Sequence, residues 1–274
     1  MIDRYATSFR RLSDSRAAAL IPYLVIGDPT SQRFTELVGV LVDNGADALE
    51  LGIAFSDPLA DGPTIQEAAA RAIGSGMTPE RSLDLVAQIR QRYPDLPIGL
   101  LVYANTVLNT PNFGAKCAAA EVDSVLIADA PLEESISLGD EAVSVRRVFV
   151  LPPNADDTLT KAIARASEGY VYVTSRAGVT GATESLSEGI GRHLPLLAES
   201  GAAPAVLGFG ISTCAQIRAA VTVGFAGVIV GSAVVQRISD NLADSQRMAA
   251  EIGAMVADMK CATVQAGRQG EANQ

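Results

Sequence analysis

The sequence has few of the residues that enzymes use for metal binding and covalent catalysis. It contains one histidine, His193, and three lysines, Lys116, Lys161 and Lys260. We therefore expect no metal site, because clustered histidines are missing. Each lysine falls in a polar, helix-like stretch rather than at the end of an apolar run, which argues against a Schiff-base lysine. Any catalysis should rest on carboxylates, hydroxyls and backbone groups.

The sequence also has few cysteines, and they are widely spaced. Cys117, Cys214 and Cys261 are odd in number and show neither disulfide nor zinc spacing. Such cysteines are typical of small buried apolar residues in a reducing compartment, so a cytoplasmic location is expected.

Positive charge and long apolar runs are scarce as well. The formal net charge is −10, with 31 acidic against 21 basic residues. Without clusters of Lys and Arg the chain should not bind nucleic acid, and an anionic substrate would need local binding groups. No window approaches the roughly 18 apolar residues of a membrane span. The mixed, charged segment Met1–Arg16 does not resemble a signal peptide.

Eight short apolar runs alternate with stretches of helical periodicity. The runs are continuous, as is typical of strands buried on both faces of a parallel sheet. Eight strands, each followed by helix, predict an α/β fold, the (β/α)8 TIM barrel, with an open doubly wound sheet as the alternative. The runs are Leu20–Ile26, Ala46–Leu51, Pro97–Tyr103, Ser124–Ala128, Arg147–Leu151, Tyr170–Thr174, Ala205–Phe209 and Gly227–Val230.

The helical stretches complete this organisation. Ser31 and Ser212 are expected N-caps, and Pro79 suits a first helical turn. An extra helix is expected over Asp3–Leu12, before the first strand. No linker breaks the chain, so we predict one domain over 1–274, with a frayed tail after about residue 262. The main helices are expected at Ser31–Asp43, Pro79–Tyr93, Asp156–Ser167, Thr213–Val223 and Ser232–Met259.

Two carboxylates stand near strand ends, where active sites of such barrels form. Glu50 lies inside an otherwise apolar run, and burial should raise its pKa towards neutrality, as acid–base catalysis requires. A structural, salt-bridged carboxylate is the alternative. Asp57 and Asp61 occur in a loop with two proline-containing turns, where each is either a turn former or a functional group.

Glycine-containing turns follow the last three strands, at Ser175–Gly181, Gly208–Ser212 and Gly231–Ser232. Glycines allow backbone N–H groups to approach an oxyanion, and a helix N-terminus adds positive potential. These turns in this order predict a phosphate site.

Other polar and aromatic residues near strand ends stay open. Tyr103 and Tyr172 are candidates for pocket lining or core packing, and Asp129 for a ligand contact or a helix cap. His193 is expected to have a surface or packing role.

The segment Leu49–Gln66, with its run Phe55–Thr64, resembles the signature of the tryptophan synthase alpha subunit family. The resemblance extends from about Tyr5 to Lys260. Its other matching segments are Gly27–Pro29, Gly99–Asn105, Val122–Asp129, Pro152–Asp156, Ser175–Gly181, Gly208–Ser212 and Gly231–Ala233.

This resemblance implies a TIM barrel that cleaves indole-3-glycerol phosphate by a retro-aldol reaction. Glu50 would be the acid–base group, and Asp61 would hold the indole N–H and stabilise positive charge there. Arg176–Glu184 would form a lid, with Thr180 meeting Asp61 on closure. The substrate would contact Tyr23, Ile65, Leu101, Tyr103, Ala128, Tyr172, Thr180 and Phe209, and the phosphate would contact Gly181, Gly210, Gly231 and Ser232.

The resemblance also implies an α2β2 assembly. Loops around Asp57-Pro58 and Asn105–Asn109 would dock onto the β subunit, which carries pyridoxal phosphate and receives indole, whereas this chain would need no cofactor. Ala54 stands where the family usually has proline and Tyr23 where phenylalanine is common. The alternatives are a stand-alone indole-3-glycerol phosphate lyase, a silent partner-binding barrel, or another phosphate-sugar barrel enzyme.

Overall fold

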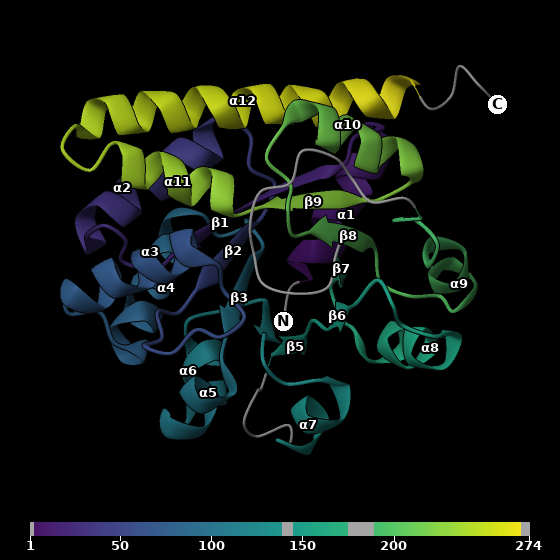
Figure 1. The fold of residues 1–274 in the computed structure, drawn as a ribbon, viewed down its shortest axis with the longest axis horizontal. Helices are drawn as coiled ribbons and strands as arrows, with labels where there is room; N and C mark the ends of the chain where they lie inside the picture. The colour runs from purple at the N-terminus through teal and green to yellow at the C-terminus, as the bar shows by residue number, and fades with distance from the viewer. Residues whose placement is uncertain (1–2, 139–144, 175–188, 270–274) are drawn as a thin grey trace.

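The computed structural model describes residues 3–138, 145–174 and 189–269. Within them, parallel strands form one sheet in the order β5-β4-β3-β2-β1-β9-β8-β7-β6. The strands lie at the centre of the molecule and the helices surround them (Figure 1). The strands are β1 (Ala19–Val25), β2 (Leu49–Gly52), β3 (Ile98–Val102), β4 (Ser124–Ile127), β5 (Arg146–Arg147), β6 (Val150–Leu151), β7 (Val171–Thr174), β8 (Ala205–Gly208) and β9 (Gly227–Val230).

The two ends of this strand order are consecutive pieces of one strand, so the sheet closes. Between β5 and β6, the Val148 N–H donates to the Val125 carbonyl of β4 at 3.0 Å, and the Phe149 carbonyl accepts from the Tyr172 N–H of β7 at 3.1 Å. The result is the predicted (β/α)8 barrel with eight strands, and the open-sheet alternative is wrong.

The helices follow the strands as expected, and the predicted extra helix before the first strand is α1. None of the helices in the described ranges is long and apolar enough to cross a membrane. The helices are α1 (Arg4–Asp14), α2 (Ser31–Asp43), α3 (Pro63–Gly74), α4 (Pro79–Arg92), α5 (Ala104–Asn109), α6 (Phe113–Ala119), α7 (Leu132–Ser137), α8 (Asp157–Ala166), α9 (Leu194–Glu199), α10 (Cys214–Val223), α11 (Ser232–Asp240) and α12 (Ser245–Gln269).

The C-terminal helical stretch is broken, so the prediction of one helix over Ser232–Met259 is wrong. The Asn241 side-chain amide donates to the Arg237 carbonyl at 2.9 Å and ends α11. Asp244 then accepts from the Arg247 N–H at 3.0 Å and starts α12. Both helices keep an apolar face across this break. Apolar periodicity alone therefore predicts one continuous helix.

Two expected N-caps are wrong by one residue. Thr30 rather than Ser31 caps α2, and Thr213 rather than Ser212 caps α10, where Gln216 completes a capping box. The true caps have extended backbone, which lets each threonine hydroxyl accept from the backbone N–H three residues later in the chain. Ser31 is already helical and cannot do so.

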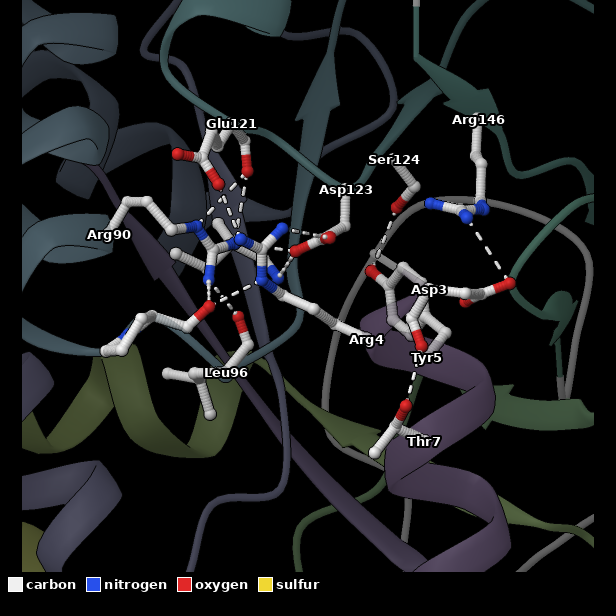
Figure 2. Close-up of polar contacts among 12 residues, drawn as sticks. Asp3, Arg4, Tyr5, Thr7, Arg90, Leu96, Glu121, Asp123, Ser124 and Arg146 are labelled. Atoms are coloured by element: carbon white, nitrogen blue, oxygen red, sulfur yellow. Dashed lines mark hydrogen bonds and ion pairs between the residues drawn. The ribbon is translucent and has the colours of Figure 1, made fainter. Parts of the chain in front are cut away.

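Helix α1 covers the N-terminal end of the barrel. Its Arg4 contacts Asp123, which directly precedes β4, with Nη1 and Oδ1 3.1 Å apart (Figure 2). Arg90 of α4 meets the other Asp123 oxygen at 2.6 Å. The Tyr5 hydroxyl hydrogen-bonds to the Ser124 hydroxyl at 2.9 Å inside the barrel. The interior of the barrel is therefore filled by side chains at this end.

Candidate active site

A cavity of about 270 Å³ lies at the C-terminal ends of the strands. It brings together both predicted catalytic carboxylates, Glu50 and Asp61. The predicted substrate contacts that line it are Tyr23, Ile65, Leu101, Ala128, Tyr172 and Phe209, and the predicted phosphate contacts are Gly210, Gly231 and Ser232.

Glu50 enters the cavity from β2 and is 2% exposed. The Tyr170 hydroxyl donates to its Oε1 at 2.9 Å. The pKa of Glu50 is raised to about 7, mainly by burial. The Tyr170 hydrogen bond opposes this rise, and the nearby charge of Asp61 adds to it. Glu50 is therefore suited to both give and take a proton near neutral pH.

Asp61 lies in the loop between β2 and α3 and is 7% exposed. The Tyr103 hydroxyl donates to Asp61 Oδ2 at 2.9 Å and accepts from the Ala60 N–H at 3.1 Å. Burial raises the pKa of Asp61 to about 6, and the Tyr103 hydrogen bond opposes that rise. Tyr103 thus positions Asp61 through this hydrogen bond. Sequence analysis placed Tyr103 against the indole ring, but it is not among the residues that line the cavity.

Two glycines make room for the tyrosines of the cavity wall. A Cβ on Gly52 would lie 2.1 Å from the Tyr23 hydroxyl oxygen, and one on Gly208 would lie 2.2 Å from the Tyr172 ring. Any side chain at these strand positions would displace an aromatic ring from the site.

The end of the cavity that the start of α11 lines is suited to an anion. Gly231 is the N-cap of α11, Ser232 is its first residue, and both line the cavity beside Gly210 and Ser212. The first N–H groups of a helix have no partner within the helix, and its N-terminus carries positive potential. This end can hold a phosphate without a basic side chain, as the acidic composition requires.

Some sequence-based candidates lie elsewhere. Asp129 accepts from the N–H of Ala104, the first residue of α5, at 2.7 Å, while Tyr103 is the N-cap of that helix. His193 is buried and hydrogen-bonds to Thr160 at 3.1 Å, in agreement with a packing role. Among the described residues no cluster of three or more His, Cys, Asp or Glu could hold a metal ion. Thr180, Gly181 and the expected lid Arg176–Glu184 lie outside the described residues.

Sequence analysis missed Tyr170 and part of the cavity wall. Tyr170 precedes β7 and has the same inward phase as Tyr172, two residues on, so period-two alternation could have identified it. The unpredicted wall residues lie at or near strand ends, which is the signal that could have found them. They include Leu126, Val150, Pro152, Thr174, Ser212 and Ala233.

Comparison with known proteins identifies the family. A family model described as tryptophan synthase alpha chain matches residues 9–264. The chain belongs to the tryptophan synthase alpha chain family. The tryptophan synthase alpha chain of Cronobacter sakazakii is 47% identical, over 97% of this chain and 100% of its own length. That of Photobacterium profundum is 48% identical, over 96% of this chain and 99% of its own length.

Solved structures of tryptophan synthase share the fold. An alpha chain from Legionella pneumophila has a TM-score of 0.84 at 25% identity, covering 96% of this chain and 98% of that one. A chain of the a2b2 complex from Pyrococcus furiosus has a TM-score of 0.79 at 32% identity, covering 89% and 98%. The resemblance to the tryptophan synthase alpha family read from the Phe55–Thr64 run is therefore confirmed, as is the barrel.

Proposed function

We propose that the chain catalyses the alpha reaction of tryptophan synthase, the retro-aldol cleavage of indole-3-glycerol phosphate to indole and glyceraldehyde 3-phosphate. One observation carries this proposal. A single cavity is lined both by two buried carboxylates, Glu50 and Asp61, and by the N-terminus of α11. This arrangement suits a substrate with a reactive aromatic end and a phosphate end.

The chemistry needs only the two carboxylates. Protonated Glu50 gives its proton to C3 of the indole ring, and ionised Asp61 holds the ring N–H and stabilises the positive charge that develops there. Glu50 then takes the proton of the hydroxyl next to the ring. The carbon–carbon bond breaks, its electron pair restores the aromatic ring, and a carbonyl forms on the departing fragment. Glu50 ends protonated, so the reaction needs no cofactor in this chain.

The cavity wall divides into two binding regions. The indole ring is proposed to lie among Tyr23, Ile65, Leu101, Ala128 and Phe209, with Tyr172 beside the glycerol chain. The phosphate is proposed to bind at Gly210, Gly231 and Ser232. Gly181, Thr180 and a lid over Arg176–Glu184 stay predictions of the sequence.

A β subunit is the proposed partner, in an α2β2 assembly in which that subunit carries pyridoxal phosphate and receives the indole. The Asp57-Pro58 loop and Asn105–Asn109 both lie beside the C-terminal face, and the latter forms helix α5. Each exposes a large apolar side chain, Leu59 at 74% and Leu108 at 63%. Such exposure near one face suits a protein partner. We further propose a single domain and a cytoplasmic location.

The experiment that tests this function measures glyceraldehyde 3-phosphate release from indole-3-glycerol phosphate, with and without a tryptophan synthase β subunit. Slow release that rises sharply with the β subunit is expected. Fast release unaffected by it would favour a stand-alone lyase, and no release in either case would favour a silent barrel.

Replacing Ser232 by aspartate should weaken substrate binding by at least about tenfold, because a carboxylate would face the phosphate at the start of α11. Titration of the substrate in an inactive Glu50→Gln background would measure this loss. Ser232→Ala is the matched control and should lose much less. Indole, which lacks the phosphate, should bind all three proteins alike, and an unchanged substrate affinity would refute the phosphate placement.

Replacing Tyr170 by phenylalanine should move the alkaline limb of the pH profile of kcat/KM to higher pH. The Tyr170 hydrogen bond stabilises ionised Glu50, so its loss raises the pKa of Glu50 above about 7. The reaction starts from protonated Glu50. With the raised pKa, this protonated form persists to higher pH. The acidic limb, assigned to Asp61 with its pKa of about 6, should move less. An alkaline limb that stays in place or moves down would contradict the assignment.

A further inference from the structure

The tyrosine hydroxyls of the chain fall into two groups. The sequence has six tyrosines, and four of their hydroxyls have hydrogen-bond partners in the protein. Within the described part of the chain, the Tyr93 hydroxyl is buried without a partner. The Tyr23 hydroxyl also has no hydrogen bond to the described protein. The four partnered ones are Tyr5 with Ser124, Tyr103 with Asp61, Tyr170 with Glu50, and Tyr172 with the backbone of Phe209.

Tyr23 differs from Tyr93 in where its hydroxyl lies. Tyr23 is 6% exposed, belongs to β1 and lines the cavity. It is the direct register partner of Glu50 in β2, and its hydroxyl lies against Gly52, one inward position nearer the C-terminal end of that strand. The charges of Asp61 and Glu50 both act on it. The hydroxyl therefore lies on the β2 side of the cavity, close to both carboxylates.

The hydroxyl of Tyr23 is a neutral donor. Burial, followed by the nearby negative charges of Asp61 and Glu50, raises its pKa well above the ordinary value of 10. Its oxygen is not among the fully enclosed side-chain atoms without a partner, so it stays accessible from the cavity that the side chain lines. Polar groups without a protein partner are retained where a ligand can pair with them. A donor without a protein partner, on a side chain that is nine-tenths buried and lines the cavity, indicates a ligand acceptor.

We propose that the Tyr23 hydroxyl donates a hydrogen bond to the oxygen of the glycerol hydroxyl next to the indole ring. This contact rests on the proposed function. Glu50 must take the proton of that substrate hydroxyl, so the hydroxyl oxygen lies on the Glu50 side of the cavity. The ring itself offers no competing acceptor, because its nitrogen carries a hydrogen that is directed to Asp61.

The same contact assists bond cleavage. As Glu50 removes the proton, negative charge develops on this oxygen until the carbon–carbon bond breaks and the carbonyl forms. A fixed donor at that oxygen stabilises the developing charge. The resemblance places phenylalanine at this position in many relatives. Tyr23 thus adds a contact to a reaction that does not depend on it, and the expected effect is moderate.

The test removes only this oxygen, by Tyr23→Phe. We expect kcat/KM for indole-3-glycerol phosphate to fall about 3–10-fold, the range of one neutral hydrogen bond. In a Glu50→Gln background, which prevents turnover, the dissociation constant of the substrate should rise by a similar factor. An analogue with both glycerol hydroxyls replaced by hydrogen, 3-(indol-3-yl)propyl phosphate, should bind equally with tyrosine or phenylalanine at position 23.

Tyr93→Phe is the matched control, because it removes a buried hydroxyl without a partner at a distance from the cavity. It should change neither kcat/KM nor either dissociation constant. Equal losses for substrate and analogue in Tyr23→Phe would assign the effect to ring packing and overturn the proposal, as would no loss at all. A wild-type chain that releases no glyceraldehyde 3-phosphate even with the β subunit would instead reject the proposed function, and this contact with it.

Discussion

Glu50→Gln should fold normally, bind indole-3-glycerol phosphate, and lose turnover by about 10²–10⁴-fold, the typical contribution of a positioned acid–base group. Glutamine preserves the volume of the side chain, and its carbonyl oxygen can still accept from the Tyr170 hydroxyl. It cannot give a proton to C3 or take one from the glycerol hydroxyl. Single-turnover cleavage and a separate binding titration would divide the loss between chemistry and affinity.

The control for this variant is Glu67→Gln, which removes an exposed carboxylate of α3 outside the cavity wall. Its turnover should equal that of the wild type. Near-normal turnover in Glu50→Gln would refute the assignment of Glu50. A loss confined to substrate affinity would make Glu50 a binding group rather than a proton donor.

The fold was predictable because its signals are local. Strands buried on both faces read as continuous apolar runs, and all four residues of β2, β4 and β9 are indeed buried. The break between α11 and α12 was not predicted because it depends on capping by Asn241 and Asp244 while the apolar periodicity continues. Single-residue caps compete too closely with their neighbours to be chosen from sequence alone.

The site was predictable where chemistry and position coincide, and less so where partners come from distant strands. Glu50 stands out as a carboxylate in an apolar run. Tyr103 and Tyr170 do not, because their hydroxyls reach Asp61 and Glu50 across 42 and 120 residues of chain. Which tyrosine supports which carboxylate is decided by barrel closure, and only the three-dimensional structure contains that information.

The ion-pair cluster at the other end of the barrel should control stability rather than catalysis. Asp123 is fully buried and accepts from Arg4 at 3.1 Å and from Arg90 at 2.6 Å (Figure 2). It also accepts from the Ile98 N–H at 2.8 Å. Arg4 and Arg90 are each about 5% exposed, so neither guanidinium can replace Asp123 by water. Arg4 also pairs with Glu121, whose side chain is 59% exposed.

Asp123→Ala should therefore lower the free energy of unfolding by about 3–5 kcal/mol, because it leaves buried positive charge and a buried N–H without their acceptor. Glu121→Ala removes a partner of the same Arg4 and should cost about 0–1 kcal/mol, because that carboxylate is largely solvated. Urea unfolding of both variants would measure the difference at a common m value. Equal losses would mean that burial does not set the strength of these pairs. A loss of kcat in folded Asp123→Ala would mean that this end of the barrel also positions Glu50, through the neighbouring Ser124 and Tyr5 in the interior.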